Sequence, residues 1–309
     1  MSGHVTQTAA QKFLVGRRGF MRGVIAMPVA IGLRGTSAFA DPHASALVSE
    51  RSPVSSRNAV LVGHSLVAHD MPWWLHNLVP GDGSVQRQVI NGSPLSYNWS
   101  NSAGAEGIDS RAVISQGDTD VLIITEAIPL QDQITWNDTY GHAKLFYDAA
   151  IDAKASARVF LYETWHDIVW AGGEAAWRER LDTDLTVWEA IVDHVNTNRN
   201  AGSEMLVVPA GQAMARLYDE IAAETVPGAT TIRDFFHDDI HPNPAGMYYV
   251  SMLMYAVIWQ RSPVGLPNTV YNEWNAPTTV EAALAARLQQ LAWETAASYP
   301  RSGVRATPR

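Results

Sequence analysis

Ser65, Asp238 and His241 are the residue types that can together turn a hydroxyl group into a nucleophile. A serine hydroxyl attacks an acyl carbon at neutral pH only when a base takes its proton, and the base in turn needs a carboxylate that orients it. Asp238 and His241 lie three residues apart in one short segment, whereas Ser65 lies far from them in the sequence. A fold that brings the two segments together could carry out acyl-group chemistry.

The elements around these residues are strongly patterned. Ser65 follows the apolar run from Asn58 to Gly63, and a run of this length that ends at glycine predicts a strand buried in a sheet. A serine just beyond that strand lies at the carboxyl edge of the sheet, where open α/β proteins bind their ligands. The segment Pro244-Ala245-Gly246 follows His241 closely and predicts the start of a helix.

Strands and helices alternate from residue 58 to about residue 260. The predicted strands are Asn58 to Gly63, Ser84 to Ile90, Asp120 to Thr125, Arg158 to Thr164 and Met205 to Pro209. Helices are predicted over about 66–78, 108–115, 140–155, 174–198, 211–224 and 244–260, with an Ala-rich helix over about 279–297. Five strands, each followed by a helix, predict a parallel sheet that helices cover on both faces.

The first forty residues have the features of an export signal. Arg17-Arg18-Gly19-Phe20-Met21-Arg22 is typical of a twin-arginine motif, and an apolar stretch and the small-residue site Ala38-Phe39-Ala40 follow it. We expect residues 1–40 to be a signal peptide, 41–56 a linker or N-terminal extension, 57–263 the main domain and 264–309 a C-terminal loop and helix. The mature protein is then expected to be periplasmic or secreted.

The composition narrows the classes of partner. The 309-residue chain is 47% hydrophobic and 17% charged, with a net charge of −9. This balance argues against nucleic acid or an anionic membrane as the partner, and no stable membrane insertion is expected. The chain has no cysteine, which excludes disulfides and thiolate chemistry. Its 11 tryptophans indicate mainly core packing, although exposed indole rings could stack on a carbohydrate.

Three short motifs, in order along the chain, resemble those of the SGNH/GDSL hydrolase superfamily. Gly63-His64-Ser65-Leu66 is similar to the first block, with His64 in place of the usual acidic or amide residue. Asn91-Gly92 follows the second predicted strand, as the second block does, and Asp238-x-x-His241 with its following Pro-Asn-x-x-Gly is similar to the last block. The resemblance covers residues 57–263 and implies a three-layer α/β/α fold with a flavodoxin-like, five-stranded parallel sheet.

The resemblance also implies roles for these residues. Ser65 would be the nucleophile, His241 the general base and Asp238 the carboxylate that orients it. The backbone N–H groups of Ser65 and Gly92 would form the oxyanion hole, and the reaction would need no metal or organic cofactor. The chain contains no Gly-x-Ser-x-Gly, which counts against the α/β-hydrolase alternative.

One family block is missing. The third block supplies an oxyanion-hole Asn within Gly-x-Asn-Asp, but the segment Thr125 to Leu130 contains no amide side chain. Loss of one such donor typically costs roughly 10²–10³ in rate, so another group is expected to substitute. Asn98 is the candidate replacement. Glu126 is expected to contact a substrate hydroxyl or to act as a structural acceptor, because an anion would oppose the developing oxyanion.

Other polar residues leave alternatives open. Asp234 and His237 form a second Asp-x-x-His pair, but Pro242 and the following helix start favour Asp238 and His241. A metal site is disfavoured because the histidines near Ser65 lack the spacing of a facing ligand pair. His166 is expected to line a pocket or a loop. Further aromatic residues follow the predicted strands and are candidates for substrate binding: Trp99, Trp136, Trp165 and Trp170.

The favoured function is therefore an exported carboxylic-ester hydrolase, with O-acetylated carbohydrate as the substrate class. Two alternatives remain, which are acyl transfer to a sugar instead of water, and a non-catalytic glycan-binding protein on the same fold. The sequence does not specify the oligomeric state.

Overall fold

The computed structural model describes residues 57–67 and 69–304. All of these residues belong to one compact unit. The expected signal peptide and linker lie outside the described residues, so those two assignments stay predictions.

A six-stranded sheet forms the centre of this unit, in the order β3-β2-β1-β4-β5-β6. The strands are β1 (Asn58–Gly63), β2 (Ser84–Val89), β3 (Glu106–Gly107), β4 (Val121–Ile124), β5 (Arg158–Glu163) and β6 (Leu206–Pro209). All neighbours pair in parallel except β2 and β3, which pair antiparallel. The five parallel strands and their flavodoxin-like order confirm the predicted fold class.

The predicted strand count of five was wrong, because β3 adds a sixth strand at the sheet edge. β3 has only two residues and lies in a polar loop, so no apolar run marks it in the sequence. Gly107 makes this pairing possible. Its φ is +92°, and a Cβ there would lie 2.1 Å from the carbonyl oxygen of Arg87.

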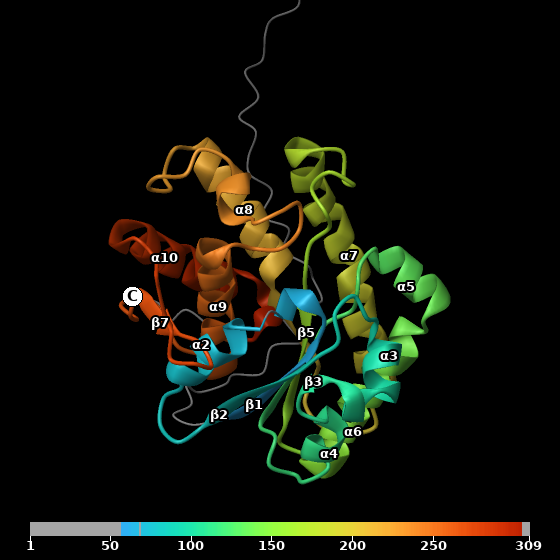
Figure 1. Ribbon diagram of the computed structural model, residues 1–309. Helices are drawn as coiled ribbons and strands as arrows, with labels where there is room; N and C mark the ends of the chain where they lie inside the picture. The colour runs from blue at the N-terminus through green and yellow to red at the C-terminus, as the bar shows by residue number, and fades with distance from the viewer. Residues whose placement is uncertain (1–56, 68, 305–309) are drawn as a thin grey trace, which may run out of the picture. The chain divides into compact units, whose positions relative to one another are not determined.

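Helices cover both faces of the sheet and give the three layers that Figure 1 shows. The α-helices are α2 (Met71–Asn77), α3 (Leu95–Ser100), α4 (Ser110–Ile114), α5 (Leu130–Trp136), α6 (Thr139–Ala153), α7 (Glu174–Asn198), α8 (Ala210–Ala222), α9 (Pro244–Trp259) and α10 (Ala282–Ser298). The central strands alternate between two hydrophobic cores. In β1, Leu61 packs with residues of α2, α8, α9 and α10, whereas Val60 and Val62 pack with residues of α3, α4 and α6.

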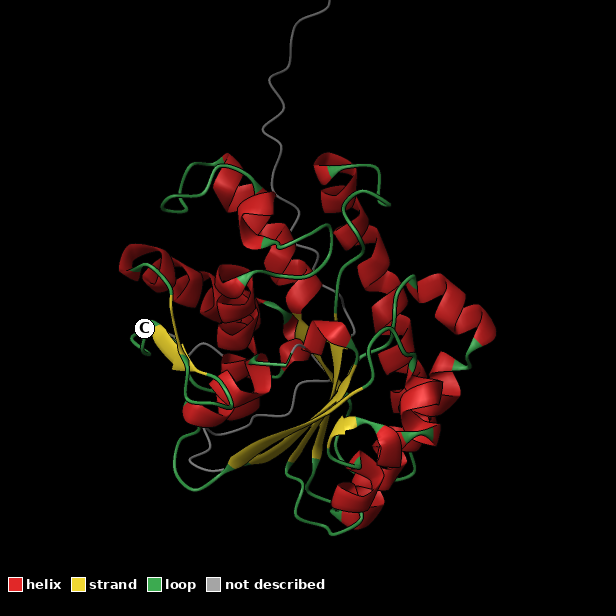
Figure 2. Cartoon of the chain, in the orientation of Figure 1, coloured by secondary structure: helices red, strands yellow, loops and turns green. Residues whose placement is uncertain are grey.

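The connections after the strands differ from prediction in three places (Figure 2). The expected helix over 66–78 is interrupted and consists of the 3₁₀ turn η1 (Ser65–Val67) and the short helix α2. The loop after β2 contains α3, and the loop after β4 contains α5, neither of which the sequence pattern predicted. These short helices matter because the loops after β1, β2 and β4 lie at the edge of the sheet where Ser65 lies.

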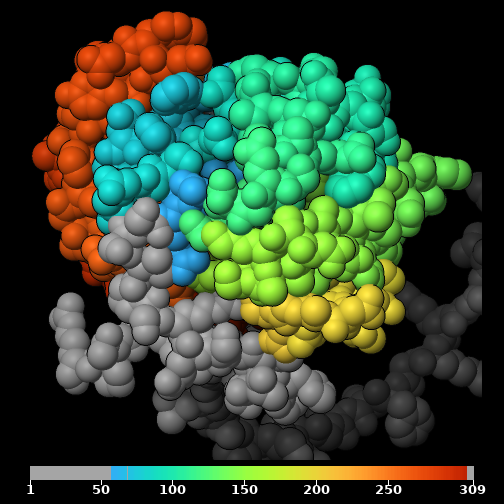
Figure 3. Space-filling view, turned by 90° about the horizontal axis from the view of Figure 1, so that it is seen from below, coloured from blue at the N-terminus to red at the C-terminus, as the bar shows by residue number. Residues whose placement is uncertain are grey.

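The C-terminal segment packs on the main domain. The hairpin of β7 (Thr269–Tyr271) and β8 (Pro277–Thr279) contacts α2, where Asn77 Nδ2 donates to the carbonyl oxygen of Tyr271 at 2.9 Å. Figure 3 shows this segment in orange beside the cyan segment that contains α2. α10 buries its apolar face against α9 and α8.

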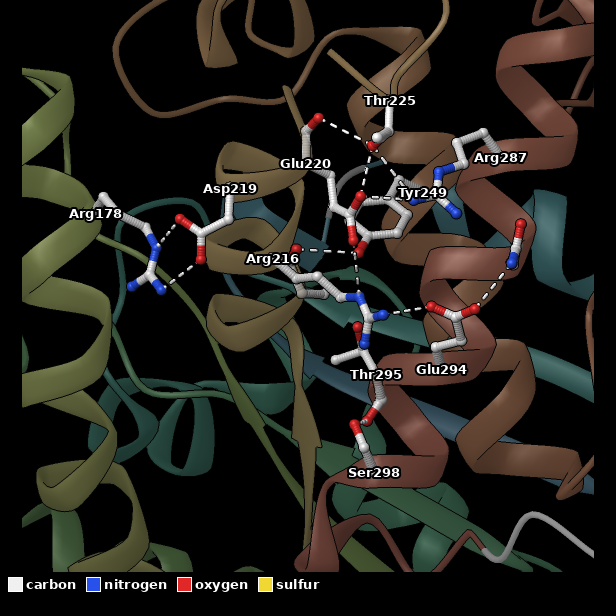
Figure 4. Close-up of polar contacts among 12 residues, drawn as sticks. Arg178, Arg216, Asp219, Glu220, Thr225, Tyr249, Arg287, Glu294, Thr295 and Ser298 are labelled. Carbon is white, nitrogen blue, oxygen red and sulfur yellow. Dashed lines mark hydrogen bonds and ion pairs between the residues drawn. The ribbon is translucent and has the colours of Figure 1, made fainter. Parts of the chain in front are cut away.

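Ion pairs join α8 to the helices on either side of it (Figure 4). Arg178 of α7 makes two hydrogen bonds, of 2.9 and 2.7 Å, to the carboxylate of Asp219. Arg287 of α10 donates to Glu220 at 2.6 Å, and Arg216 pairs with Glu294. The last helix is thereby fixed to the core of its own chain. Among residues 57–67 and 69–304, no helix has both the length and the apolar character needed to cross a membrane.

Candidate active site

The nucleophile turn begins where β1 ends at Gly63. A Cβ at Gly63 would lie 2.4 Å from Cγ2 of Thr125 and 2.8 Å from Cγ2 of Val67, so only glycine allows β1 to pass so close to the end of β4. The chain then turns into η1, where Val67 N–H donates to the carbonyl oxygen of His64 at 2.9 Å. Ser65 therefore stands at the first position of a short 3₁₀ turn at the carboxyl edge of the sheet.

His64 lies beneath this turn, and only 3% of its surface is exposed. Its Nε2 lies 3.0 Å from the carbonyl oxygen of Glu126, and its Nδ1 lies 3.4 Å from the N–H of Leu66. Burial lowers the pKa of His64 to about 4, because a charged imidazole would lose its hydration. A neutral ring with the proton on Nε2 satisfies both contacts, since Nε2–H donates and Nδ1 accepts.

Asp238 and His241 form a tight loop before α9. The Oδ1 atom of Asp238 accepts the N–H groups of Ile240, at 2.8 Å, and His241, at 2.7 Å. Its Oδ2 lies 2.8 Å from Nδ1 of His241. Burial by itself would raise the pKa of Asp238, but these hydrogen bonds outweigh it and hold the pKa at about 2. The carboxylate is therefore ionised and oriented toward the imidazole.

The exit of β5 holds this loop in place. The indole N–H of Trp165 donates to the carbonyl oxygen of Ile240 at 2.8 Å, and the N–H of Ile168 donates to that of Asp239 at 2.8 Å. On the other side, Asn243 caps α9, because its Oδ1 accepts the N–H groups of the first helical turn. The loop that carries His241 is thus held by the exit of β5 on one side and by α9 on the other.

The structure brings together the three residues expected to form a triad. Nε2 of His241 lies 2.9 Å from Oγ of Ser65, and Nδ1 faces Asp238. The side chains of His241 and Asp238 are 42% and 54% exposed, so the site opens directly to solvent. Within the described part of the chain, the alternative pair, Asp234 and His237, does not form a comparable contact. Asp234 binds the backbone N–H groups of Thr230 and Thr231, and no contact joins it to His237 among those recorded for the described residues.

Gly92 lies in the turn that follows β2. The N–H of Ser93 donates to the carbonyl oxygen of Ile90 at 3.1 Å, and Gly92 has a φ of +67°, which glycine adopts without strain. Apart from Gly92 itself and its two neighbours in the chain, no atom of the described residues lies within 4 Å of where its Cβ would be. Within residues 57–67 and 69–304, the backbone N–H groups of Ser65 and Gly92 donate to no recorded acceptor. Both groups are therefore available to an external oxygen atom.

Asn98 does not fit the role expected of it. Its side chain is fully buried in α3, where Nδ2 donates to the carbonyl oxygens of Ser93 and Pro94, each at 3.3 Å. Its Oδ1 accepts from Gln88 at 3.1 Å. The prediction that Asn98 replaces the missing oxyanion donor was wrong, because its amide hydrogens already bind the start of its own helix.

Glu126 is a structural acceptor, which is one of the two roles expected of it, and the other role, contact with the substrate, was wrong. Its side chain is fully buried, and both carboxylate oxygens accept hydrogen bonds from the protein. Oε1 accepts from Leu95 N–H at 2.9 Å and Ala127 N–H at 2.8 Å, and Oε2 accepts from the Thr139 hydroxyl at 2.8 Å. Burial raises the pKa of Glu126, and these three hydrogen bonds oppose the rise.

The tryptophans proposed for substrate binding also have other roles. Trp165 is 1% exposed and holds the His241 loop. Trp99 packs edge-to-face on Phe146, with Arg111 over its ring, and lines a cavity of about 700 Å³ that contains no triad residue. Trp136 and Trp170 are the exposed rings, at 79% and 77%. The position of a tryptophan in a predicted loop does not show whether its side chain is buried. The substrate-binding predictions for Trp99 and Trp165 failed for this reason.

The remaining candidates are structural. His166 is buried, and its Nε2 lies 3.0 Å from the carboxylate of Asp184. Among the residues that the structure describes, no group of three or more His, Asp or Glu side chains is placed to hold a metal ion. Sequence reasoning missed Trp165 as the residue that supports the loop, and nothing local to Trp165 in the sequence indicates its contact with Ile240.

The strand order and the position of the Ser65 turn and the His241 loop at one sheet edge identify the fold. It is a three-layer α/β/α fold with a flavodoxin-like order of parallel strands. The glycine turn expected after β2 is present, whereas the exit of β4 carries Thr125 and Glu126 and no amide side chain.

Two solved structures are similar to this chain. A protein from Parabacteroides merdae described as a GDSL-like lipase is 14% identical over 66% of this chain and 95% of its own, with a TM-score of 0.44. A carbohydrate esterase family 3 protein from Talaromyces cellulolyticus is 15% identical over 63% of this chain and 92% of its own, with a TM-score of 0.39. No protein-family model and no curated protein matches the chain.

Proposed function

We propose that this chain is an exported serine esterase that hydrolyses carboxylic esters through Ser65, His241 and Asp238. The observation that carries the proposal is the continuous chain of contacts from Oγ of Ser65 to the carboxylate of Asp238, with distances of 2.9 and 2.8 Å. Both distances lie within hydrogen-bond range, so a proton can pass from the hydroxyl to the imidazole without rearrangement.

The reaction follows from this geometry. Oγ of Ser65 forms a bond to the acyl carbon while its proton passes to Nε2 of His241, and Asp238 stabilises the resulting imidazolium. The carbonyl oxygen becomes an oxyanion that the N–H groups of Ser65 and Gly92 can bind. His241 then protonates the leaving alcohol as the ester bond breaks. A water molecule, deprotonated by His241, attacks the acyl-serine and releases the acid and the free enzyme.

We further propose O-acetylated carbohydrate as the substrate class. The triad is exposed, and three cavities of about 700, 630 and 290 Å³ have no triad residue in their linings. An open site suits a small acyl group on a bulky alcohol better than a long acyl chain, which needs an apolar wall. The exposed rings of Trp136 and Trp170 lie in the segments after β4 and β5, on the strand-exit side of the sheet, where they could stack on sugar rings.

Labelling of Ser65 tests the catalytic role. An organophosphonate should modify Ser65, and Ser65→Ala and His241→Ala should each lower kcat on p-nitrophenyl acetate by about 10³-fold or more. His237→Ala, the matched control from the alternative pair, should keep wild-type activity. If the wild-type chain were not labelled and released no nitrophenol, it would be a non-catalytic protein. Ester formation with an added sugar would identify it as an acyltransferase instead.

Export is part of the proposal and rests on the motif at Arg17 and Arg18. N-terminal sequencing of the protein recovered outside the cytoplasm tests it, and a mature chain that begins at Asp41 is the expected result.

A further inference from the structure

The carboxylate of Glu126 is the buried centre of a set of contacts beside the proposed site. None of its surface is exposed, and both of its oxygens receive hydrogen bonds from other groups of the chain. A buried carboxylate is costly unless it is fully hydrogen-bonded. Glu126 lies where the third family block would supply an amide, and its carboxylate cannot serve as that hydrogen-bond donor.

The donors to Glu126 belong to three different elements. Leu95, whose N–H lies 2.9 Å from Oε1, is the first residue of α3 and lies three residues after Gly92. Thr139, whose hydroxyl lies 2.8 Å from Oε2, is the first residue of α6. Ala127, whose N–H lies 2.8 Å from Oε1, continues the exit of β4. One side chain therefore fixes the end of the Gly92 loop to the exit of β4 and to α6.

The backbone of Glu126 extends this connection to the nucleophile. Its carbonyl oxygen accepts Nε2–H of His64, the residue directly before Ser65. The Gly92 loop and the Ser65 turn are thus both attached to the same residue, one through its side chain and the other through its main chain. The distance between their two N–H groups, which would bind the oxyanion, depends on this shared attachment.

We propose that Glu126 is a positioning residue that sets the Gly92 loop relative to Ser65, and so does indirectly what the missing third-block amide would do by direct contact. This inference rests on the proposed esterase function. With no third-block Asn, the oxyanion depends on backbone N–H groups, whose placement must be accurate to well under 1 Å. Direct contact with the substrate is excluded because the carboxylate is fully buried and both oxygens are occupied.

Three substitutions separate the geometry of Glu126 from its charge. Glu126→Gln preserves every contact, because its amide oxygen can accept from Leu95 and Ala127 while its NH₂ group donates to the Thr139 hydroxyl. Glu126→Asp keeps the charge but is one methylene too short to reach Leu95, and Glu126→Ala removes all the contacts. We expect kcat within about threefold of wild type for Glu126→Gln. For the other two we expect kcat to fall by about 10- to 100-fold with KM nearly unchanged.

Thr139→Val is the matched control. It removes the donor to Oε2 but leaves the contact with Leu95, so it should lower the melting temperature and keep kcat. Wild-type kcat in folded Glu126→Asp or Glu126→Ala would overturn the proposal. Loss of activity in Glu126→Gln as severe as in Glu126→Ala would also overturn it, because the charge would then be what matters. If Glu126→Ala does not fold, the comparison of Gln with Asp still decides.

Hydrogen exchange provides a readout that does not depend on esterase activity. The amide of Leu95 should exchange faster in Glu126→Ala and Glu126→Asp than in wild type, and at the wild-type rate in Glu126→Gln. Unchanged exchange in all three variants would overturn the proposal even if the protein is an active esterase. Conversely, a wild-type protein without turnover and without labelling of Ser65 would refute the esterase function. The exchange rates of Leu95 would then still show whether Glu126 holds the end of the Gly92 loop.

Discussion

His64 has two contacts that only a neutral imidazole can make at the same time. Nε2–H donates to the carbonyl oxygen of Glu126, and Nδ1 accepts the N–H of Leu66. A shorter side chain such as Asp or Asn would not reach Glu126 in the same way. His64 therefore ties the nucleophile turn to the exit of β4.

This arrangement makes the stability of the protein sensitive to acid. The pKa of His64 is about 4 in the folded protein and near 6.5 in the unfolded chain. Below pH 6.5 the unfolded chain takes up a proton that the folded protein does not accept until about pH 4, so protonation favours unfolding. Across this range His64 should remove about 3 kcal/mol from the free energy of unfolding.

His64→Gln tests this prediction, because glutamine can donate to Glu126 and does not titrate. Its loss of the Leu66 contact should shift stability by an amount that does not change with pH. Urea denaturation at pH 7.5, 6, 5 and 4 should show wild type losing stability relative to the variant as the pH falls. Parallel pH dependences for the two proteins would contradict the burial of a neutral His64.

The sequence predicted some residues of the candidate site better than others, for a physical reason. Asp238 and His241 lie in one short loop, so their contact depends on local geometry that the Asp-x-x-His spacing encodes. Asn98 is buried because it belongs to α3, which contacts β1 and α6, and Glu126 is buried where it binds the first N–H of α3. The sequence pattern did not predict α3. Side-chain direction in a loop depends on packing between elements, which spacing alone does not contain.

At the scale of elements, the His241 loop depends on the exit of β5. Trp165 is buried and packs edge-to-face on Phe236, with ring centroids 6.1 Å apart, and its indole N–H binds Ile240 directly before His241. The loop has no helix or strand of its own to hold the imidazole at 2.9 Å from Ser65. Its position is therefore set by contacts with another element.

Replacement of Trp165 by Phe removes this hydrogen bond but keeps an aromatic ring. We expect kcat to fall about three- to tenfold, because the loss of roughly 1 kcal/mol of anchoring lets the imidazole leave its alignment more often. Trp259→Phe is the matched control, since Trp259 is fully buried and its indole N–H has no acceptor among the described residues. Steady-state kinetics at saturating substrate measure both. Equal losses in the two variants would mean that ring volume, not the hydrogen bond, is responsible.

The elements that the sequence predicted well are those with long or strongly apolar patterns. The helix over 174–198 was predicted with the bounds that α7 has, and β1 was also predicted with its bounds. The predicted helix over 66–78 is interrupted between η1 and α2, and Pro72 stands in the first turn of α2. β3 and the β7–β8 hairpin escaped prediction because strands of two or three residues carry no detectable alternation.

At the scale of the whole domain, the strand order explains why the candidate site lies where it does. Connections from β1 lead to β2 on one side, and the chain later returns to β4 on the other side. The loops after β1 and β4 therefore diverge, and open α/β folds bind ligands at such a switch point. Ser65 follows β1 and Glu126 follows β4, so the nucleophile and its positioning residue flank this point. The apolar pattern predicted the alternation of strands and helices, and the motif resemblance implied the flavodoxin-like strand order that the structure confirms.

The openness of the site leads to a prediction about acyl-chain length. Each methylene that an enzyme buries against an apolar wall contributes about 0.8 kcal/mol to binding. No cavity among those described adjoins the triad, so a longer acyl chain would stay in water and gain little of this energy. Values of kcat/KM on p-nitrophenyl esters should therefore not rise from acetate to octanoate, with Ser65→Ala as the background control. The exposed triad can meet an ester on a large polymer, so acetate release from acetylated polysaccharide should also be lost in Ser65→Ala. A rate that rises with chain length would instead require an apolar acyl site at Ser65, and the carbohydrate-ester proposal would then give way to a lipase.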